Sequence, residues 1–212
     1  MLLHRILLAD DHALLLDAFS KLLEPDFTVV GKLQNGRSVL HEARKLRPDI
    51  ILLDMHMPLL NGLEAGRQIK KLMPEIQLVY LTVDEDPELV NEAIQAGASG
   101  YLIKNSAASE LFHALREVVQ GRVYITPLLK QAMEKKFVQG TGKRLMTQKL
   151  TSRQREVLQL LGEGHSMKQI GSILHVTPRT VAFHKYRMME DLRMKSGAEL
   201  IHLAMQEGLL AK

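Results

Sequence analysis

The sequence predicts an α/β unit with a five-stranded, doubly wound parallel sheet, then a linker and an all-α unit of four helices. Three observations predict this. Apolar runs alternate with amphipathic stretches through the first part of the chain, as in parallel α/β domains. Residues 50–53 and 78–81 are apolar without alternation, which is typical of strands buried on both faces. The last part carries repeated helix-start signals.

In chain order, we expect strands at residues 5–9, 27–33, 49–53, 77–82 and 99–103. Amphipathic helices are expected at residues 12–23, 37–46, 63–72, 87–96 and 107–120. Because the strands are parallel, their carboxyl ends meet at one edge of the sheet. Ligands of such sheets bind at that edge, so the residues that follow the strands are the first candidates for a site.

Residues 124–149 differ from the preceding part. They contain no β-type run, six lysines and arginines, and Gly140-Thr-Gly142. This composition is typical of a partly helical, mobile linker. We place the first domain at residues 1–126, the linker at 127–147 and the second domain at 148–212.

The second domain has four helix starts. Three have the capping-box spacing, in which Ser or Thr precedes Glu or Gln by three residues: Thr151 with Gln154, Ser166 with Gln169, and Ser196 with Glu199. The fourth is Thr177-Pro178, a capping hydroxyl followed by proline at the first helical position. Helix stops are expected at Gly162, Gly164 and Gly208.

Composition excludes several classes of protein. Of the 212 residues, 46% are hydrophobic and 25% are charged, as in ordinary globular domains. The absence of cysteine excludes disulfide scaffolds and thiolate zinc modules. No apolar run is long enough to span a bilayer, and the first ten residues make a poor secretory signal. We therefore expect a cytoplasmic protein without membrane contact.

Charge is divided unevenly along the chain. Residues 1–127 hold 13 Lys and Arg against 17 Asp and Glu, a net charge of −4. Residues 128–212 hold 15 against 7, a net charge of +8. The basic part is a candidate for binding nucleic acid. The chain lacks tryptophan and has 4% aromatic residues, which disfavours stacking of single-stranded bases.

Chemistry-bearing side chains follow four of the expected strands. They are Asp10 and Asp11, then Asp54, Thr82 and Lys104. Three converging carboxylates require a cation, and hard oxygen ligands with open positions suit Mg²⁺. A carboxylate is also a competent nucleophile toward phosphorus, and Asp54 is the central candidate. The metal and the ammonium would neutralise charge on the transferred group.

Residues 1–126 resemble the receiver domain of two-component response regulators. The resemblance rests on Ile6-Leu-Leu-Ala-Asp-Asp11, Asp54-Met-His-Met-Pro58 with Asn61-Gly62, Thr82, and Tyr101-Leu-Ile-Lys104. It implies a flavodoxin-like sheet of strand order 2-1-3-4-5. It also implies that Asp54 accepts a phosphoryl group from a histidine kinase.

The resemblance assigns further roles. The implied Mg²⁺ ligands are Asp10 (largely through water), Asp11, Asp54 and the main-chain oxygen of His56. Lys104 and Thr82 would contact the phosphoryl group, and Tyr101 would move inward behind it. Pro58 and Gly62 would shape the loop after the acceptor.

Three positions at this site vary within the family pattern. The side chains of His56 and Asp84 rim the expected site and could alter the lifetime of the phosphoryl group. Val83 stands where the family usually has a small residue, and its extra methyl groups could narrow access. The expected effect is on the rate of phosphorylation.

Residues 166–186 are expected to fold as helix, short turn and helix. Val181, Met188 and Leu192 form an inward row, whereas Phe183 and Tyr186 lie on the opposite face. An exposed Phe is unusual on a purely solvated surface, and against DNA it could touch thymine methyl groups. Packing of Phe183 on a neighbouring helix is the alternative.

Residues 150–210 resemble the LuxR-type helix-turn-helix. The resemblance rests on Leu150-Thr-Ser-Arg-Gln-Arg-Glu-Val-Leu158, Gly164, Lys168-Gln-Ile170, Leu174-His-Val-Thr177, Thr180-Val181, His184, Leu192 and Ala198-Glu-Leu200. With the receiver motifs, nearly the whole chain resembles the NarL/FixJ family. The resemblance implies that the helix from Pro178 enters the major groove.

The DNA-binding candidates fall into two groups. Candidates for phosphate contacts are Lys168, Thr177, Arg179, Thr180 and Lys185. Candidates for base-edge contacts are Ala182, Phe183 and Tyr186. Asp191 replaces the family's usual lysine and follows Glu190, so we expect weaker phosphate contact at that end of the helix. Ala182 offers no hydrogen bond where the family often has lysine.

The resemblance implies a phosphorylation-controlled transcription factor and not an enzyme. Phosphate on Asp54 would free a recognition helix that the receiver can mask, and would favour a homodimer on double-stranded DNA. The alternative is a DNA-binding regulator with a weakly active receiver that works without phosphorylation. A phosphatase is disfavoured because Asp54-Met-His lacks a second Asp, and a flavin domain because three carboxylates would repel the flavin phosphate.

Overall fold

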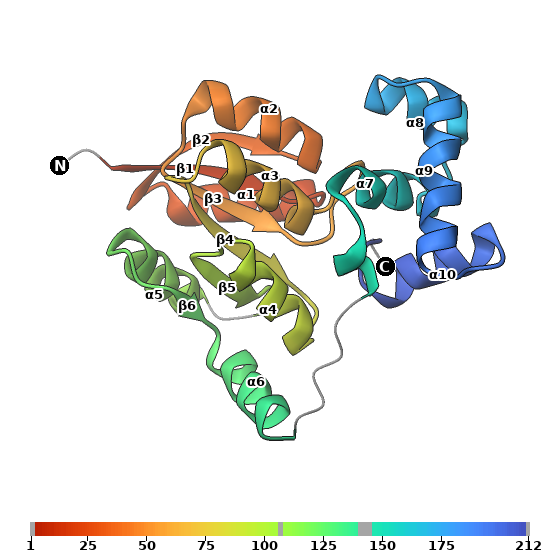
Figure 1. The fold of residues 1–212 in the computed structure, drawn as a ribbon. Coiled ribbons are helices and arrows are strands. Elements are labelled where there is room, and N and C mark those ends of the chain that lie inside the picture. The colour runs from red at the N-terminus through yellow and green to blue at the C-terminus, as the bar shows by residue number, and fades with distance from the viewer. Residues whose placement is uncertain (1–2, 106–107, 140–145, 211–212) are drawn as a thin grey trace.

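The computed structural model describes residues 3–105, 108–139 and 146–210 of the chain, without the side chains of residues 136–139 (Figure 1). The strands are β1 (His4–Ala9), β2 (Phe27–Leu33), β3 (Ile50–Asp54), β4 (Gln77–Thr82), β5 (Gly100–Ile103) and β6 (Tyr124–Ile125). The first helices are α1 (Ala13–Leu23), α2 (Gly36–Leu46), α3 (Gly62–Leu72), α4 (Pro87–Gln95), α5 (Ala108–Val119) and α6 (Pro127–Gln139). A 3₁₀ turn, η1 (Met146–Lys149), precedes α7 (Ser152–Gly162), α8 (Met167–Leu174), α9 (Pro178–Asp191) and α10 (Gly197–Gln206).

All strands pair in parallel in the order β2-β1-β3-β4-β5-β6. The expected order of the first five strands is confirmed. The sixth strand is an addition, because Tyr124 and Ile125 pair with Gly100 and Tyr101. The expectation of no strand within residues 124–149 is therefore wrong. A strand of two residues is too short to show an alternation of apolar and polar side chains. It forms because the edge of β5 is available for pairing.

Helices cover both faces of the sheet (Figure 1). One apolar cluster joins the sheet to α2, α3 and α4, through residues such as Val39, Ile69 and Val90. The other joins it to α1 and α5, through residues such as Leu16 and Leu115. The strands between these layers are buried on both sides, which accounts for the unbroken apolar runs at β3 and β4.

Helix α6 packs against the receiver unit. Leu129 is fully buried in the cluster that contains α4, and Met133 is packed against that cluster. Residues 127–139 of the expected linker are thus helical, with Leu129 in the receiver core and Met133 packed against that core. Residues 140–145, which include Gly140 and Gly142, lie outside the described residues.

Helices α7 to α10 share a separate apolar core that includes Val157, Ile170, Val181 and Leu200. The capping boxes at Thr151 and Ser166 are both complete. Ser196 also caps its helix by accepting from Glu199 N, but the Glu199 carboxylate reaches back to Lys195 N instead. Thr177 caps α9 through Thr180 N at 3.1 Å, with Pro178 in the first turn.

No helix in residues 3–105, 108–139 and 146–210 combines the length and apolar character that a membrane span requires.

Candidate functional site

The carboxyl edge of the sheet brings Asp10, Asp54 and Lys104 together. Asp54 ends β3 and is 2% exposed, and Asp10 follows β1 and is 1% exposed. The Lys104 ammonium, at the end of β5, lies 2.8 Å from Asp10 Oδ2 and 3.0 Å from Asp54 Oδ1. The convergence expected from parallel strands is therefore present for these three groups. A single cation between two buried carboxylates leaves the cluster one negative charge in excess.

The ionisation of Asp54 and Lys104 follows from this arrangement. Burial raises the pKa of Asp54 to about 6, with Lys104 opposing the rise and Asp10 adding to it. Burial alone would lower the pKa of Lys104, but Asp10 and Asp54 together raise it. At neutral pH Asp54 is thus an ionised, poorly solvated carboxylate, which is the state a nucleophile requires.

Asp11 lies beside the cluster and faces solvent more than its neighbour does. Its side chain is 28% exposed, and its Oδ1 lies 2.7 Å from His12 Nδ1. The same His12 nitrogen lies 3.1 Å from Asp10 Oδ1, so one atom of each of the three residues falls within 4.8 Å of the others. Sequence reasoning missed His12, because a single exposed histidine after two aspartates is not a distinctive pattern.

The donor set fits a hard divalent cation. Oδ2 of Asp10 and Oδ1 of Asp11 are buried oxygens that accept no well-directed hydrogen bond from the described residues. Oδ2 of Asp10 lies 2.8 Å from the Lys104 ammonium and Oδ1 of Asp11 lies 2.7 Å from His12 Nδ1. Burial is the main cause of the raised pKa of Asp54, and the neighbouring Asp10 carboxylate adds to it. Carboxylate oxygens beside a solvent-facing position suit Mg²⁺, which retains several waters.

The loop after Asp54, residues 55–61, is shaped by close backbone packing. A Cβ at Gly62 would lie 1.9 Å from the main-chain oxygen of Asp54, so only glycine fits there. Asn61 caps α3 by accepting from Glu64 N at 2.8 Å. The His56 backbone N–H donates to Asp54, and His56 Nε2 lies 3.3 Å from Asp84 Oδ2. The two rim residues therefore pair with each other.

The two switch candidates are both buried. Thr82 is 0% exposed, and its hydroxyl accepts from Asp84 N at 2.9 Å. Tyr101 is also 0% exposed, and burial raises the pKa of its phenol. The family resemblance implies that Tyr101 moves inward behind a phosphoryl group, but here its side chain is inward already. It belongs to the apolar cluster that receives Leu129 of α6.

The second candidate site is the outer face of α9. Phe183 and Tyr186 are 64% and 61% exposed, so the alternative in which Phe183 packs on a neighbouring helix is wrong. Val181, Met188 and Leu192 are buried in the helical core, as expected. Ala182 is half-buried beside the two aromatic residues.

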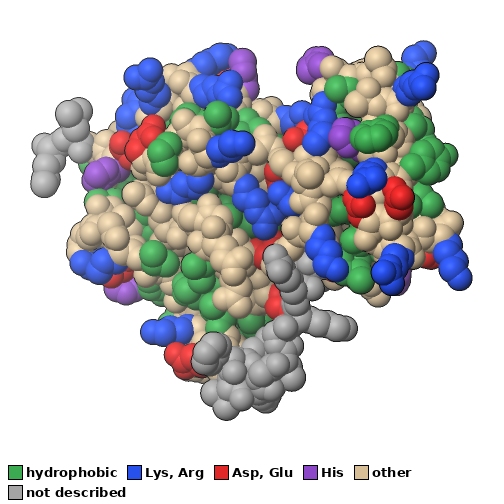
Figure 2. Space-filling model, in the orientation of Figure 1, with side chains coloured by type: hydrophobic (Ala, Val, Ile, Leu, Met, Phe, Trp, Pro, Cys, Tyr) green, Lys and Arg blue, Asp and Glu red, His purple; other side chains and the backbone are tan. Residues whose placement is uncertain are grey.

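The candidates for phosphate contacts lie on or near this face. Lys168, Thr177 and Arg179 are exposed, and Thr180 and Lys185 are half-buried. Figure 2 shows lysine and arginine side chains spread over the helical unit, on the right, and near its junction with the receiver unit. Arg187 lies 3.3 Å from Glu190 and 3.4 Å from Asp191, which places the acidic end of α9 in local ion pairs.

Helix α7 makes the main contact between the two units, since it packs against α3 on one side and α9 on the other (Figure 1). The segment after α10 adds a contact, because a Cβ at Gly208 would lie 3.6 Å from His56 Nε2. The receiver does not cover Phe183 or Tyr186. The expectation that the receiver masks the recognition helix is therefore wrong for this arrangement, in which α7 occupies the junction.

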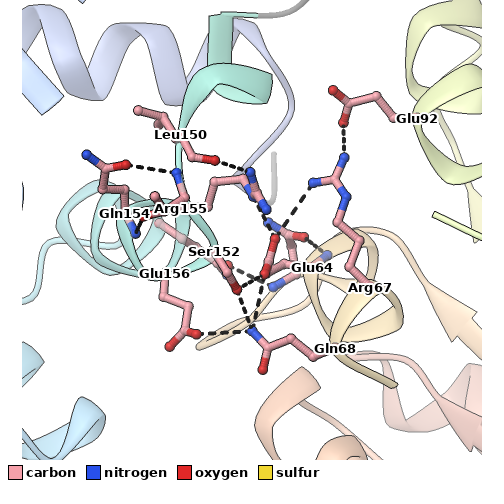
Figure 3. A network of polar contacts seen from close by, with 12 residues as sticks. Glu64, Arg67, Gln68, Glu92, Leu150, Ser152, Gln154, Arg155 and Glu156 are labelled. Carbon is pink, nitrogen blue, oxygen red and sulfur yellow. Dashed lines mark hydrogen bonds and ion pairs between the residues drawn. The ribbon is translucent and has the colours of Figure 1, made fainter. Parts of the chain in front are cut away.

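Polar side chains dominate the contact between α3 and α7 (Figure 3). Glu64 is 1% exposed and accepts from Arg155 Nε at 2.6 Å and from the Ser152 hydroxyl. Gln68 Nε2 donates to Glu64 Oε1 at 3.2 Å and to Glu156 Oε1 at 3.0 Å. Such polar contacts regain hydrogen bonds from water on separation, so this junction suits reversible docking. Nothing in the sequence pairs these residues, which are about 90 positions apart.

Comparison with known proteins matches both units. Residues 6–116 match the family described as "Response regulator receiver domain", and residues 148–204 match "Bacterial regulatory proteins, luxR family". The response regulator GacA of Pseudomonas aeruginosa is 32% identical over 208 residues, with 97% of each chain covered. The transcriptional regulatory protein YdfI of Bacillus subtilis is 34% identical over 211 residues, with 98% of each covered.

Solved structures share the fold. A LuxR-family two-component response regulator from Aurantimonas sp. SI85-9A1 is 29% identical, with a TM-score of 0.62 over 64% of this chain and 99% of its own. RcsB from Salmonella typhimurium is 24% identical, with a TM-score of 0.62 over 95% of this chain and 98% of its own. Receiver domains generally bind Mg²⁺ at an acidic site like this one. The chain belongs to the NarL/FixJ family of two-component response regulators, which are transcription regulators with a receiver and a LuxR-type DNA-binding domain.

Proposed function

We propose that Asp54 is the phosphoacceptor and that its phosphorylation controls binding of double-stranded DNA by α9. The observation that supports this most directly is the position of Asp54, whose carboxylate lies 3.0 Å from the Lys104 ammonium at the carboxyl edge of the sheet. The donor would be a sensor histidine kinase, as the receiver domain implies.

The chain's own residues divide the work of phosphoryl transfer. An Asp54 oxygen attacks phosphorus, and the leaving group departs on the opposite side. Lys104 neutralises charge on the transferred oxygens, and Thr82 turns its hydroxyl toward them. Asp10, Asp11, Asp54 and the main-chain oxygen of His56 would hold Mg²⁺, which supplies electrostatic stabilisation of the equatorial oxygens. Tyr101 is already buried and would stay inward behind the phosphoryl group.

The DNA-binding role rests on the outer face of α9. Lys168, Thr177, Arg179, Thr180 and Lys185 would contact phosphates, and Ala182, Phe183 and Tyr186 would reach base edges. Solved structures of RcsB, which shares the fold, include a complex with DNA and dimers bound to DNA. A homodimer on two half-sites is the corresponding proposal for this chain. Residues 1–126 would act as the receiver, 127–147 as the linker and 148–212 as the DNA-binding domain.

Phosphate labelling tests the acceptor. With labelled acetyl phosphate and Mg²⁺, the wild-type chain should gain one hydroxylamine-sensitive label and Asp54→Asn none. Asp49→Asn, at the opposite end of β3, is the matched control and should label normally. Equal labelling of Asp54→Asn would overturn the assignment. Release of many phosphates per chain from small phosphate esters would instead support a phosphatase.

A second candidate function is DNA binding that does not depend on phosphorylation. Two observations favour it. Tyr101 is inward without a phosphoryl group, and Phe183 and Tyr186 are exposed while the domains are docked. Equal operator affinity with and without a phosphoryl mimic would support this candidate.

A further inference from the structure

We propose that Gln159 and Glu163, in the DNA-binding domain, are positioning residues for phosphoryl transfer at Asp54. They hold the loop of residues 55–61 in a conformation that opposes phosphorylation. This inference rests on the proposed function of Asp54 and adds to it two residues about 100 positions away in the chain.

Both side chains bind the backbone of this loop. Gln159 is 1% exposed and makes two hydrogen bonds, from Nε2 to Met57 O at 2.9 Å and from Asn61 N to Oε1 at 2.7 Å. Leu59 N donates to both carboxylate oxygens of Glu163, at 3.0 and 3.3 Å. Gln159 Nε2 also donates to Glu163 Oε1 at 2.7 Å, so the two side chains act as one clamp.

The clamped backbone is strained at its centre. Leu59 has a φ of +67°, in the left-handed region that non-glycine residues rarely adopt. That conformation is unfavourable for a residue with a Cβ. The Leu59 side chain packs against the apolar core of the helical unit. The DNA-binding domain thus supplies both hydrogen bonds and an apolar contact to this loop.

The loop connects the clamp to the reaction. Met57, whose carbonyl accepts from Gln159, is adjacent to His56, whose backbone N–H donates to Asp54. Undocking removes the hydrogen bonds from Gln159 and Glu163 and the apolar contact at Leu59, so the loop is less restrained when the domains separate. If the loop has one conformation when the domains are docked and another when they are separated, both docking and phosphorylation at Asp54 can shift the balance between the two conformations.

The direction of the effect follows from reciprocity. If a phosphoryl group on Asp54 releases the effector domain, then docking must disfavour the phosphoryl group by the same free energy. Substitutions that remove the clamp should therefore act like undocking and strengthen binding of a phosphoryl mimic. Couplings of this kind typically change affinity by about 5- to 150-fold.

The test measures the affinity of the full chain for beryllofluoride with Mg²⁺, together with hydrogen exchange of the Leu59 amide. In the wild-type chain the Leu59 amide should be protected, and beryllofluoride should remove that protection. The double variant Gln159→Leu/Glu163→Ala should lose the protection without the mimic and bind beryllofluoride at least about fivefold more tightly. Operator binding by the variant reports whether its helical unit remains folded.

Two single variants separate positioning from general damage. Glu163→Gln keeps an acceptor for Leu59 N and should behave like the wild type, whereas Glu163→Ala should move toward the double variant. Glu190→Ala is the control, because Glu190 is an exposed acid that pairs with Arg187 on α9. It should leave the affinity for beryllofluoride unchanged.

Each contrary outcome has a separate meaning. If the double variant loses Leu59 protection but binds beryllofluoride as the wild type does, the clamp does not position the site. An unprotected Leu59 amide in the wild type would also overturn the inference. If the wild type binds no beryllofluoride at all, the proposed function of Asp54 fails first.

Discussion

At the scale of single residues, Asp54 carries the largest conflict between stability and function. Its carboxylate is buried beside a second carboxylate, and its pKa is raised from 3.8 to about 6. In the unfolded chain the pKa of Asp54 returns to about 3.8. Between about pH 4 and 6 the folded state therefore binds a proton at Asp54 that the unfolded state has lost. Stability contributed by this group is therefore lost as the pH rises through that window.

The first prediction concerns this charge. In metal-free buffer at pH 7.5, Asp54→Asn should raise the free energy of unfolding by roughly 2–3 kcal/mol, from about 1.4 kcal/mol per pKa unit. The gain should fade as the pH approaches 4, where Asp54 is protonated in both states. Urea unfolding at the two pH values checks this. A gain that is equal at both pH values would contradict the account, and exposed Asp17→Asn should give no gain.

The second prediction separates the two kinds of DNA contact. Arg179→Ala should weaken operator binding on every sequence and reduce the slope of log affinity against log salt by about 0.9, the value for one phosphate contact. Phe183→Ala should weaken binding without changing that slope and should relax sequence preference. Titrations at several salt concentrations check both variants. A salt slope that changes with Phe183→Ala would contradict its place at a base edge.

Residue types at the strand ends could be predicted from the sequence, and tertiary partners could not. Asp10, Asp54 and Lys104 follow three strands, so parallel pairing alone brings them together. His12 was missed, because an exposed histidine after an aspartate has no distinctive pattern. Gln159 and Glu163 were missed for another reason, since their partners are backbone groups about 100 residues away.

At the scale of elements, α6 is where the structure adds most to the sequence. Residues 127–139 carry no clear amphipathic pattern, yet Leu129 is fully buried in the receiver core while Leu128 is 51% exposed. Strand β6 delivers the chain to this position by pairing with β5. A two-residue strand, or a helix held mainly by one buried side chain, forms because of the neighbouring structure that it packs against. Local sequence periodicity does not show that neighbouring structure.

The third prediction tests this packing of α6. Leu129→Ala should lower the free energy of unfolding by about 2–5 kcal/mol, through lost burial and the cavity left behind. Its neighbour Leu128→Ala should change the value by no more than about 0.5 kcal/mol, as for exposed positions. Chemical unfolding of the full chain measures both. Equal effects at the two positions would show that α6 does not pack on the receiver as described.

The ten main helices and strands of the first 120 residues were predictable to within one or two residues at each end. Their signals are strong, because each strand is buried on two faces and each helix on one. The helical unit was equally predictable from its caps at Thr151, Ser166, Thr177 and Ser196.

At the scale of the whole molecule, the polar junction between α3 and α7 links the two functions. Glu64 and Glu156 each bind side chains from both domains, and the clamp of Gln159 and Glu163 extends the contact to the loop of residues 55–61. Phe183 and Tyr186, on the outer face of α9, stay exposed while the two units are in contact. Control by docking therefore has to act through the orientation or pairing of the DNA-binding domains, and not through cover of α9.

The fourth prediction and the most direct test of phosphorylation control is operator affinity with and without beryllofluoride, measured for the wild type and for Asp54→Asn at fixed salt and Mg²⁺. We expect the mimic to tighten wild-type binding by at least about fivefold and to leave Asp54→Asn unchanged. If the wild type binds beryllofluoride and its operator affinity does not move, the receiver does not control the DNA-binding domain.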